Sequence, residues 1–441
     1  MSKLDKLLRE LCPDGVEYVK LGTLCSLITK QTGFDYTNHI KARLLMEPAE
    51  NAVPYIQTKF FAGKNFNYQT DYYVPMDIVK QFPKITLDEK CILFSIVGAS
   101  IGNVGLFPGE RKCFLGGAIC VAKVLPQYDV DYVYYCVESH NVQHQIRRKT
   151  KGAGQATITV EDIREFEIPL PPIEIQSEIV RILDNFTNLT AELVKELTAR
   201  KTQYSFYRDK LLTFNTPVEW KPMEKEFPFI RNGFVGTVTP YFTGEEQGVR
   251  YLEGTNIHDG VISDNEVIYV SKEFHQKHIR NELKDGDILM VQSGHVGECA
   301  VVDDKYAGSN CHALIIMSNA GRCNSRFVMH YLRSTEGKAG LKKITTGGTV
   351  KHILASNMKK FMIPVPPLDV QNRIVNVLDN FEKICSDLNI GLPAEIEARQ
   401  KQYEYYRDKL LTFAENGNTI LSRAEQSRAE QSRAEQSRAE H

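Results

Sequence analysis

Residues 168–186 read IPLPPIEIQSEIVRILDNF and residues 363–381 read IPVPPLDVQNRIVNVLDNF, so one stretch of sequence occurs twice in this chain. The two copies match at 11 of 19 positions without a gap. Further on, ARKTQYSFYRDKLLTF (199–214) matches ARQKQYEYYRDKLLTF (398–413) at 12 of 16 positions. The offset grows from 195 to 199, so the second copy carries four extra residues. A repeat this strong indicates two copies of one structural unit.

The repeated stretch has the pattern of a long helix. Each copy begins with a proline pair, Pro171-Pro172 or Pro366-Pro367, and proline is tolerated at a helix start but not inside one. Apolar residues then recur at steps of mostly four and three, which is the seam that two packed helices share. About 40 residues of helix span roughly 60 Å. We predict two long helices that pack against each other, with a break in the second at Gly391 and Pro393.

The segments outside the helices also form two distant copies. Three blocks correspond at an offset near 195: 53–66 with 249–262, 98–105 with 293–300, and 132–148 with 327–343. Strand-like and helix-like runs alternate in them, which predicts a mixed α/β (α+β) fold. The expected division is a first module (1–165), a first helix (166–214), a second module (215–362), a second helix (363–413) and a tail (414–441). The tail repeats SRAEQ without an apolar face, so we expect a disordered or mobile helical segment.

Composition narrows the class of protein. The 441 residues carry a formal net charge of −1, which by itself does not indicate nucleic-acid binding. The ten cysteines form no CxxC pair, and no signal peptide or apolar run of membrane length is recognisable. We therefore expect a cytoplasmic protein with reduced cysteines.

Motifs of catalysis are missing from the sequence. It contains no GxxxxGK[ST] phosphate loop, no strand-GxGxxG-helix fingerprint and no Asn/Asp-Pro-Pro-aromatic motif of an amine methyltransferase. His275 and His278 lie close together, but no further ligand residues surround them in the sequence. We predict no catalytic residues and no metal site, and hence a binding protein.

Binding residues recur at equivalent places in the two modules. Basic side chains supply affinity for phosphate, and glycine lets backbone amides approach an anion. The loops at 57–59 and 255–256 also offer side chains able to read base edges. The competing interpretation of the basic stretches is a solvated helix end, and that of the two loops is ordinary turn chemistry. The candidate DNA-binding residues are Gln57, Thr58, Lys59, Arg147, Arg148, Lys149, Lys151, Gln155, Thr157, Thr255, Asn256, Lys342, Lys343, Thr345, Thr346, Lys351 and His352.

With these stretches in view, the chain resembles a specificity (S) subunit of a type I restriction–modification enzyme. The resemblance covers residues 1 to about 413, and its most specific parts are the two 19-residue stretches and the two YRDKLLTF endings. It implies that each module is a target recognition domain for one half of a split DNA site, and that the helices form an antiparallel coiled coil. It also implies two methyltransferase subunits with S-adenosylmethionine and a motor-nuclease subunit using ATP and Mg, with no cofactor in this chain.

Apolar and aromatic residues of the two long helices are the expected docking positions for partner subunits. They are Ile179, Leu183, Phe186, Tyr204, Tyr207, Ile374, Leu378, Phe381, Tyr403 and Tyr406. Two rival functions remain at this point: a fused methyltransferase or nuclease, and a coiled-coil adaptor whose modules bind protein instead of DNA. The first lacks the motifs named above, and salt-dependent binding to duplex DNA would separate the second from our interpretation.

Overall fold

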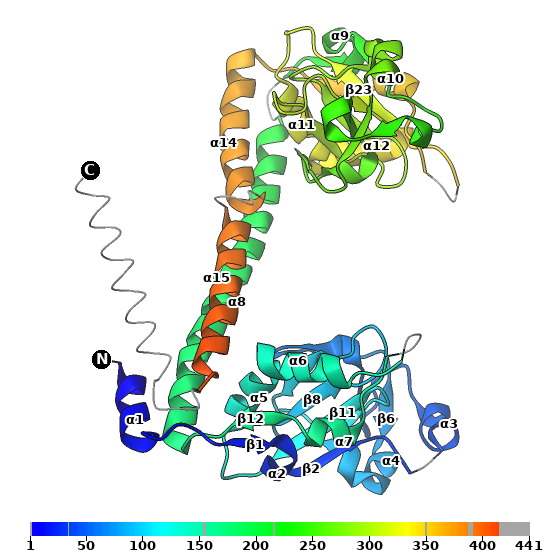
Figure 1. Cartoon of the computed structure of the whole chain (residues 1–441). Helices are drawn as coiled ribbons and strands as arrows, with labels where there is room; N and C mark the ends of the chain where they lie inside the picture. Colours follow the sequence, from blue (N-terminus) through cyan, green and yellow to red (C-terminus); the bar gives the residue numbers. More distant parts are fainter. Residues whose placement is uncertain are drawn as a thin grey trace, which may run out of the picture. The chain divides into compact units, whose positions relative to one another are not determined.

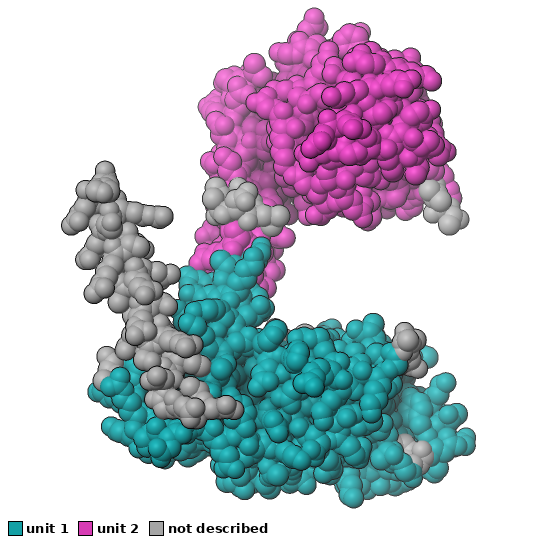
Figure 2. All heavy atoms as spheres, in the orientation of Figure 1, with its two compact units in different colours: residues 1–192, 397–441 teal, residues 193–396 magenta. Residues whose placement is uncertain are grey.

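The computed structural model describes residues 2–33, 35–152, 156–214, 217–348, 351–386 and 391–413. The chain divides into two compact units, one of residues 1–192 with 397–441 and one of residues 193–396 (Figure 2). Each unit contains one globular module together with part of both long helices. The SRAEQ tail lies outside the described residues, so its state stays a prediction.

The two predicted long helices are confirmed. Helix α8 (Ile173–Leu212) is 40 residues long and begins directly after Pro172. The second stretch begins after Pro367 and consists of α14 (Leu368–Ser386) and α15 (Leu392–Leu410), which confirms the break. Figure 1 labels all three helices.

The long helices pack antiparallel through stacked aromatic rings. In the first unit Phe186 of α8 stacks on Tyr406 of α15, with ring centroids 5.4 Å apart. In the second unit Tyr207 of α8 stacks on Phe381 of α14 at 5.6 Å. Residue numbers rise along α8 while they fall along its partners, so the helices run in opposite directions. The 4-3 spacing of the sequence is therefore an antiparallel coiled-coil seam.

The first module is built on two four-stranded sheets. One has the strand order β2-β11-β8-β9 and is antiparallel throughout. The other has the order β6-β3-β10-β7, in which β3 and β10 are parallel. The strands are β2 (Cys25–Lys30), β11 (Ile119–Val124), β8 (Cys91–Ser95), β9 (Val104–Phe107), β6 (Tyr73–Pro75), β3 (Ala52–Ile56), β10 (Cys113–Leu115) and β7 (Thr86–Leu87). The predicted strand runs at 55–56, 91–97 and 118–124 correspond to β3, β8 and β11.

Short helices and a strand pair complete the first module. Strand β1 (Tyr18–Lys20) pairs antiparallel with β12 (Glu167–Pro169), which brings the two ends of the module together. The predicted lead-in helix is α1 (Lys3–Leu11), which starts with a capping box between Ser2 and Asp5. The remaining elements are α2 (Leu21–Leu24), α3 (Tyr36–His39), α4 (Met76–Gln81), α5 (Val130–Glu138), α6 (His140–Lys149), α7 (Val160–Arg164), β4 (Phe61–Ala62) and β5 (Asn65–Phe66).

The second module repeats this topology. Its sheet β14-β23-β20-β21 has the antiparallel order of β2-β11-β8-β9, and its sheet β15-β19-β16-β22 repeats β6-β3-β10 with an edge strand at the opposite side. A strand pair, β13 with β24, again joins its two ends. The strands are β13 (Trp220–Pro222), β14 (Phe229–Asn232), β15 (Phe242–Thr243), β16 (Gly248–Leu252), β17 (Ile257–His258), β18 (Val261–Ile262), β19 (Ile268–Ser271), β20 (Ile288–Val291), β21 (Cys299–Val301), β22 (Asn310–Cys311), β23 (Leu314–Ser318) and β24 (Met362–Pro364).

The helices of the second module repeat those of the first. They are α9 (Met223–Glu226), α10 (Lys272–Lys277), α11 (Ser325–Arg333), α12 (Thr335–Ile344) and α13 (Ala355–Lys359). Helices α11 and α12 follow β23 as α5 and α6 follow β11. The structure thus confirms that the two modules are copies of one α+β fold.

Each module shares a core with the long helices of its unit. In the first unit Ile179 and Leu183 of α8 are completely buried in one cluster with Tyr132 and Tyr135 of α5. In the second unit Leu378 of α14 is completely buried with Phe327 of α11. Burying a leucine side chain stabilises a fold by about 1.5–3 kcal/mol. The helix repeat therefore holds each module in place as well as forming the seam.

A repeated glutamine explains part of the sequence match. The side-chain oxygen of Gln176 accepts the backbone N–H of Asp129 at 3.1 Å, and its amide donates to the Pro171 carbonyl at 2.8 Å. Gln371 does the same with Asn324 at 2.9 Å and Pro366 at 2.7 Å. Both amides are buried, so losing either would leave backbone groups unpaired.

Candidate nucleic-acid interface

The basic stretch of the first module lies at the end of α6. Arg147 and Arg148 are exposed in its last turn, and Lys149 is half-buried. Beyond them, Lys151 and Thr157 face each other and exchange backbone hydrogen bonds of 3.0 and 2.9 Å. Both side chains are exposed, so the structure gathers these predicted residues on one edge of the module. Gln155 lies outside the described residues.

The second module has the same arrangement at the end of α12. Lys342 and Lys343 are exposed in the last turn. Thr346 and His352 then exchange backbone hydrogen bonds of 2.8 Å each, and Lys351 is exposed beside them. Thr345 is half-buried, and its hydroxyl donates to the Leu341 carbonyl at 2.8 Å. Its side chain therefore satisfies a carbonyl in the last turn of α12.

A glycine at a neighbouring strand end supports each of these loops. Gly98 (φ 82°) and Gly294 (φ 80°) lie at equivalent positions in the left-handed region, where a residue with a Cβ is strained. The Gly98 amide donates to the Ala156 carbonyl at 3.1 Å. In the second module Ser293 forms a β-bridge with His352. The matching glycine stretches of the sequence therefore shape a loop that recurs beside both basic helix ends.

The loop at residues 57–59 opens onto a cavity of about 450 Å³. Gln57 and Thr58 line it, and Gln31 joins them from the end of β2. The Gln31 amide donates to the Leu115 carbonyl at 2.5 Å. Lys59 is exposed and forms an ion pair with Asp71. The complete lining is Gln31, Tyr36, Tyr55, Gln57, Thr58, Gly116, Gly117 and Ala118.

The corresponding loop of the second module differs. Thr255 is exposed, but Asn256 has no exposed surface. The Asn256 side chain accepts the Glu253 N–H at 2.8 Å and donates to the carbonyls of Ser263 and Asn265. These three bonds hold the loop from Glu253 to Asn265 closed. Asn256 is therefore a structural residue here, and we leave it out of the proposed interface.

A second cavity, of about 500 Å³, lies at the end of β14 in the second module. Strand β14 is the counterpart of β2, so the two cavities occupy related places in the two modules. Its lining is more basic than that of the first: Arg231, Asn232, Gly233, Phe234, Val235, His278, Arg280 and Asn281. Sequence reasoning missed Gln31, Arg231 and Arg280. For Gln31 and Arg231 the signal is a polar stretch just before a glycine at the end of β2 and of β14, as in Gln31-Thr-Gly33 and Asn232-Gly233. Arg280 carries no such local signal.

Most of the expected docking residues are used inside the chain. Ile179, Leu183, Ile374, Leu378, Tyr204 and Tyr403 are all buried within their own units. Phe186, Phe381 and Tyr406 are half-buried, and Tyr207 is 36% exposed. Other apolar side chains of the long helices are exposed: Leu189, Val194, Phe206, Val377, Ile384 and Tyr405.

The repeated YRDKLLTF ending anchors each module to a helix. In the first unit Asp408 accepts the backbone N–H of His140, the first residue of α6, at 2.9 Å. In the second unit Asp209 accepts the N–H of Thr335, the first residue of α12, at 2.9 Å, and also its hydroxyl. A carboxylate at a helix N-terminus satisfies free amides and complements the helix dipole. The identical sequence therefore performs the same structural task twice.

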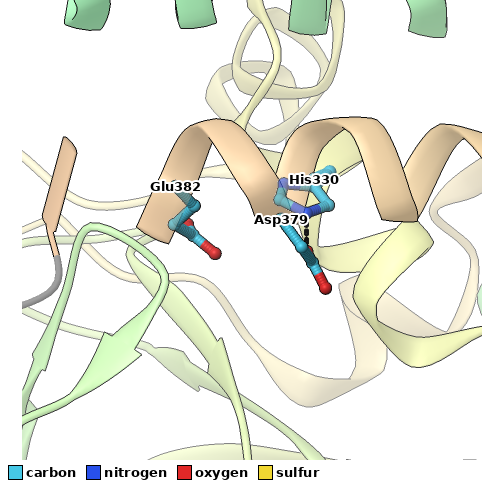
Figure 3. A group of neighbouring side chains, drawn as sticks. All are labelled: His330, Asp379 and Glu382. Atoms are coloured by element: carbon cyan, nitrogen blue, oxygen red, sulfur yellow. Dashed lines mark hydrogen bonds and ion pairs between the residues drawn. The ribbon is translucent and has the colours of Figure 1, made fainter. Parts of the chain in front are cut away.

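Where α11 meets α14, a buried cluster contains His330, Asp379 and Glu382 (Figure 3). The three could in principle surround a metal ion, but their ligand atoms are already paired. His330 bonds to Asp379 at 2.8 Å and to the Tyr204 hydroxyl at 3.1 Å. Glu382 pairs with Arg333 and, at 2.9 Å, with Arg326. With two guanidinium groups on one carboxylate, the cluster is an ion-pair network, not a metal site.

Burial controls the protonation of His330. It lowers the pKa of the imidazole below its ordinary value, against the opposing effect of the Asp379 carboxylate. Burial would raise the pKa of Asp379, but hydrogen bonds from His330 and Arg326 leave it below the usual value. The network therefore holds a neutral imidazole between a hydroxyl and a carboxylate, with Glu382 and Arg333 nearby.

We expect the second unit to lose stability as the pH falls below about 6.5, the ordinary pKa of histidine. An imidazole with a lowered pKa in the folded state takes up its proton more readily when unfolded, so acid favours unfolding. Trp220 is the single tryptophan of the chain and contacts Tyr331 of α11, so its emission reports this unit during urea unfolding. His330→Tyr copies the first module, where Tyr135 donates to Asp184, and should flatten the decline. An equal decline in both proteins would contradict this role of His330.

The fold and the repeated basic loops define a two-module protein with one candidate anion-binding edge per module. The family model of the type I restriction modification DNA specificity domain matches residues 13–200 and again residues 222–398. These matches cover most of the chain. The chain therefore belongs to the type I restriction–modification DNA specificity family.

Individual relatives agree with this assignment. The chain is 32% identical over 274 residues to the specificity subunit of the type I restriction enzyme EcoR124I/EcoR124II of Escherichia coli. That match covers 57% of this chain and 63% of the relative. A putative type I restriction enzyme specificity subunit of Haemophilus influenzae is 33% identical over 282 residues, covering 60% of this chain and 68% of the relative.

Solved structures share the fold. An S subunit of a type I restriction–modification system from M. genitalium superposes with a TM-score of 0.51 at 14% identity, covering 90% of this chain and 96% of that one. A chain from a study of complex assembly in a type I restriction–modification system gives a TM-score of 0.55 at 16% identity, covering 91% and 98%. Among the described residues, no helix is long and apolar enough to cross a membrane.

Proposed function

We propose that this chain is the DNA sequence-recognition subunit of a type I restriction–modification complex and reads a bipartite, asymmetric site. One observation carries the proposal: the same exposed basic loop recurs at the end of α6 and of α12, in two modules of one fold whose neighbouring cavities differ. Two modules with the same fold but different cavity linings are suited to two different DNA half-sites. Family membership supports the same function.

Phosphate contact and base reading would fall on different residues. The exposed basic side chains at 147–151 and 342–351 would contact phosphates, which positions each module but carries no sequence information. The cavity side chains would read bases, because amides bind adenine edges and guanidinium groups bind guanine edges in pairs of hydrogen bonds. We assign this role to Gln31, Gln57 and Thr58 in the first module and to the exposed Arg280 in the second. Arg231 is left out because its guanidinium already donates to the Ser318 hydroxyl at 2.8 Å and to the Glu282 carbonyl at 3.2 Å.

Catalysis would reside in partner subunits. We propose that the exposed apolar side chains of α8, α14 and α15 dock two methyltransferase subunits, which in turn recruit the restriction subunits. S-adenosylmethionine, ATP and Mg would belong to those partners, and this chain would contribute recognition without a cofactor. The functional segments would be residues 1–165 and 215–362 for recognition and 166–214 and 363–413 for docking. The place of action would be the cytoplasm, where all ten cysteines stay as the free thiols seen here.

The test uses the chain assembled with its methyltransferase subunits and a library of random DNA duplexes. The proposal predicts that bound duplexes share two fixed blocks separated by a gap of constant length. Gln57→Ala combined with Thr58→Ala should relax the bases of one block and leave the other unchanged. Arg280→Ala is the matched variant and should relax the other block. A protein-binding adaptor would enrich no sequence, and that result would overturn the proposal.

A further inference from the structure

The helices by which the two modules dock carry opposite charges at equivalent positions. Helix α5 presents Asp131 and Glu138, and α11 presents Arg326 and Arg333 at the same positions, 195 residues further on. The two residues of each helix are seven apart, which is two helical turns, so they lie on one face. In the first unit Glu138 on this face contacts α15, and in the second unit both arginines contact α14.

The acidic pair of the first module is matched by cations. Glu138 accepts the hydroxyls of Tyr134 and Tyr403 and lies 3.7 Å from a guanidinium nitrogen of Arg407. Asp131 pairs with Lys64 at 2.8 Å, and Lys64 reaches on to Asp184 of α8. Lys64 belongs to the module itself, whereas Tyr403 and Arg407 belong to α15.

The basic pair of the second module is matched by carboxylates of α14. Arg333 pairs with Glu382, and both side chains are nearly buried, at 7% and 10% exposure. Arg326 pairs with Asp379 at 2.6 Å and with Glu382 at 2.9 Å. Losing a partner in such a place leaves a desolvated charge, which is strongly unfavourable.

The long helices are otherwise alike at these sites. Asp184 of α8 corresponds to Asp379 of α14, and Tyr403-Arg407 of α15 corresponds to Tyr204-Arg208 of α8. Position 187 differs, because α8 has Thr187 where α14 has Glu382. The apolar seam residues are similar in the two copies and do not distinguish the modules, whereas this charge pattern differs between them.

We infer that each module is matched by charge to its own part of the helix pair, and that Glu138 and Arg333 determine this pairing. If the modules exchanged places on unchanged helices, Glu138 would face the carboxylate of Glu382, with Arg208 in the place of Arg407. Arg333 would face Arg407 with only Thr187 in place of its carboxylate partner. A second copy of the first module, or a module from another chain, would dock only where its charge at this position is complemented. This inference does not depend on the DNA target.

The test transplants the charge pattern of one unit into the other within the full-length chain. Glu138→Arg should destabilise the first unit and speed hydrogen exchange at the α5 amides by at least tenfold. Adding Thr187→Glu supplies the carboxylate that the second unit has, and should restore at least half of the lost protection. Thr187→Glu alone should destabilise, because the new carboxylate faces Glu138. Trp220 emission reports the other unit and should not change in any of the three variants.

The reciprocal variants test the second unit with the same logic. Arg333→Glu should lower the thermal midpoint reported by Trp220 by roughly 5 °C. Adding Glu382→Thr removes the facing carboxylate, leaves Arg208 as partner, and should recover part of that shift. If Glu138→Arg prevents the first unit from folding, Glu138→Gln tests the loss of the ion pair with Arg407 instead, again by hydrogen exchange at the α5 amides. Equal protection and equal midpoints with and without the second substitution, in both units, would overturn the inference.

Discussion

Leu378→Lys is expected to unfold the second unit under conditions in which the natural chain is folded. Leu378 has no exposed surface and packs in the cluster that joins α14 to α11. A lysine there must bury its charge without a partner or push the two helices apart, and either outcome costs several kcal/mol. The change in Trp220 emission when its contact with Tyr331 is lost, together with loss of helical circular dichroism, measures the effect.

The neighbouring residue provides the control. Val377 is 43% exposed on the same helix, so Val377→Lys should leave Trp220 emission and the thermal midpoint nearly unchanged. Leu183→Lys is the equivalent change in the first unit, where Leu183 is also completely buried. Methyltransferase assembly should fail with Leu183→Lys and Leu378→Lys because a unit is unfolded. Normal folding of both lysine variants would show that the helices are not the scaffold of the modules.

Removing the basic residues in the last turn of α12 and in the loop after it is expected to weaken DNA binding without harming the fold. Lys342, Lys343 and Lys351 are exposed, so replacing all three with alanine removes three cations and little packing. If each contacts one phosphate, the slope of log affinity against log salt should become shallower by about 2.7. Affinity near physiological salt should fall by roughly 10- to 100-fold. Fluorescence anisotropy of the assembled complex over a series of salt concentrations measures both quantities.

A control variant distinguishes the effect of the position of the lysines from the effect of total charge. Lys225, Lys359 and Lys360 are also exposed lysines of the second unit, in α9 and at the end of α13. Replacing these three with alanine changes net charge equally and should leave the salt slope unchanged. If both triple variants lower affinity by the same factor, the loop after α12 is not the phosphate-binding edge.

The elements that repeat in the sequence were the predictable ones. The proline pairs located the starts of α8 and α14, and Gly391 with Pro393 located the break before α15. These signals are local, so they can be read without tertiary structure. The equivalence of the modules was also readable, because blocks such as 98–105 and 293–300 keep their spacing while side chains change.

The parts of the site that could not be predicted depend on contacts distant in sequence. Glu138 meets Arg407, which lies 269 positions later, and no spacing rule connects them. Asn256 has a side chain of the type that reads bases, but its three hydrogen bonds to the backbone become visible only in the folded loop. Gln31 was overlooked because the cavity that makes it a candidate is formed by segments around residues 31, 57 and 117 together.

The expected docking residues show how one periodicity can serve two purposes. The 4-3 spacing marks every buried face of a helix, whether the neighbour is another helix, a module or a partner subunit. Leu183 and Leu378 satisfy the pattern by contacting their own modules. The exposed side chains of Val194 and Phe206 follow no seam and were therefore not among the predicted residues.

The most direct measurement is methylome sequencing of cells that contain the partner subunits, with and without the gene for this chain. The account predicts that deletion abolishes adenine methylation at one split, asymmetric motif and leaves other modified motifs untouched. Restoring the chain with Gln57→Ala and Thr58→Ala should return methylation with a relaxed requirement in one half of that motif. An unchanged methylome in the presence of an active methyltransferase partner would contradict the assignment of sequence recognition to this chain.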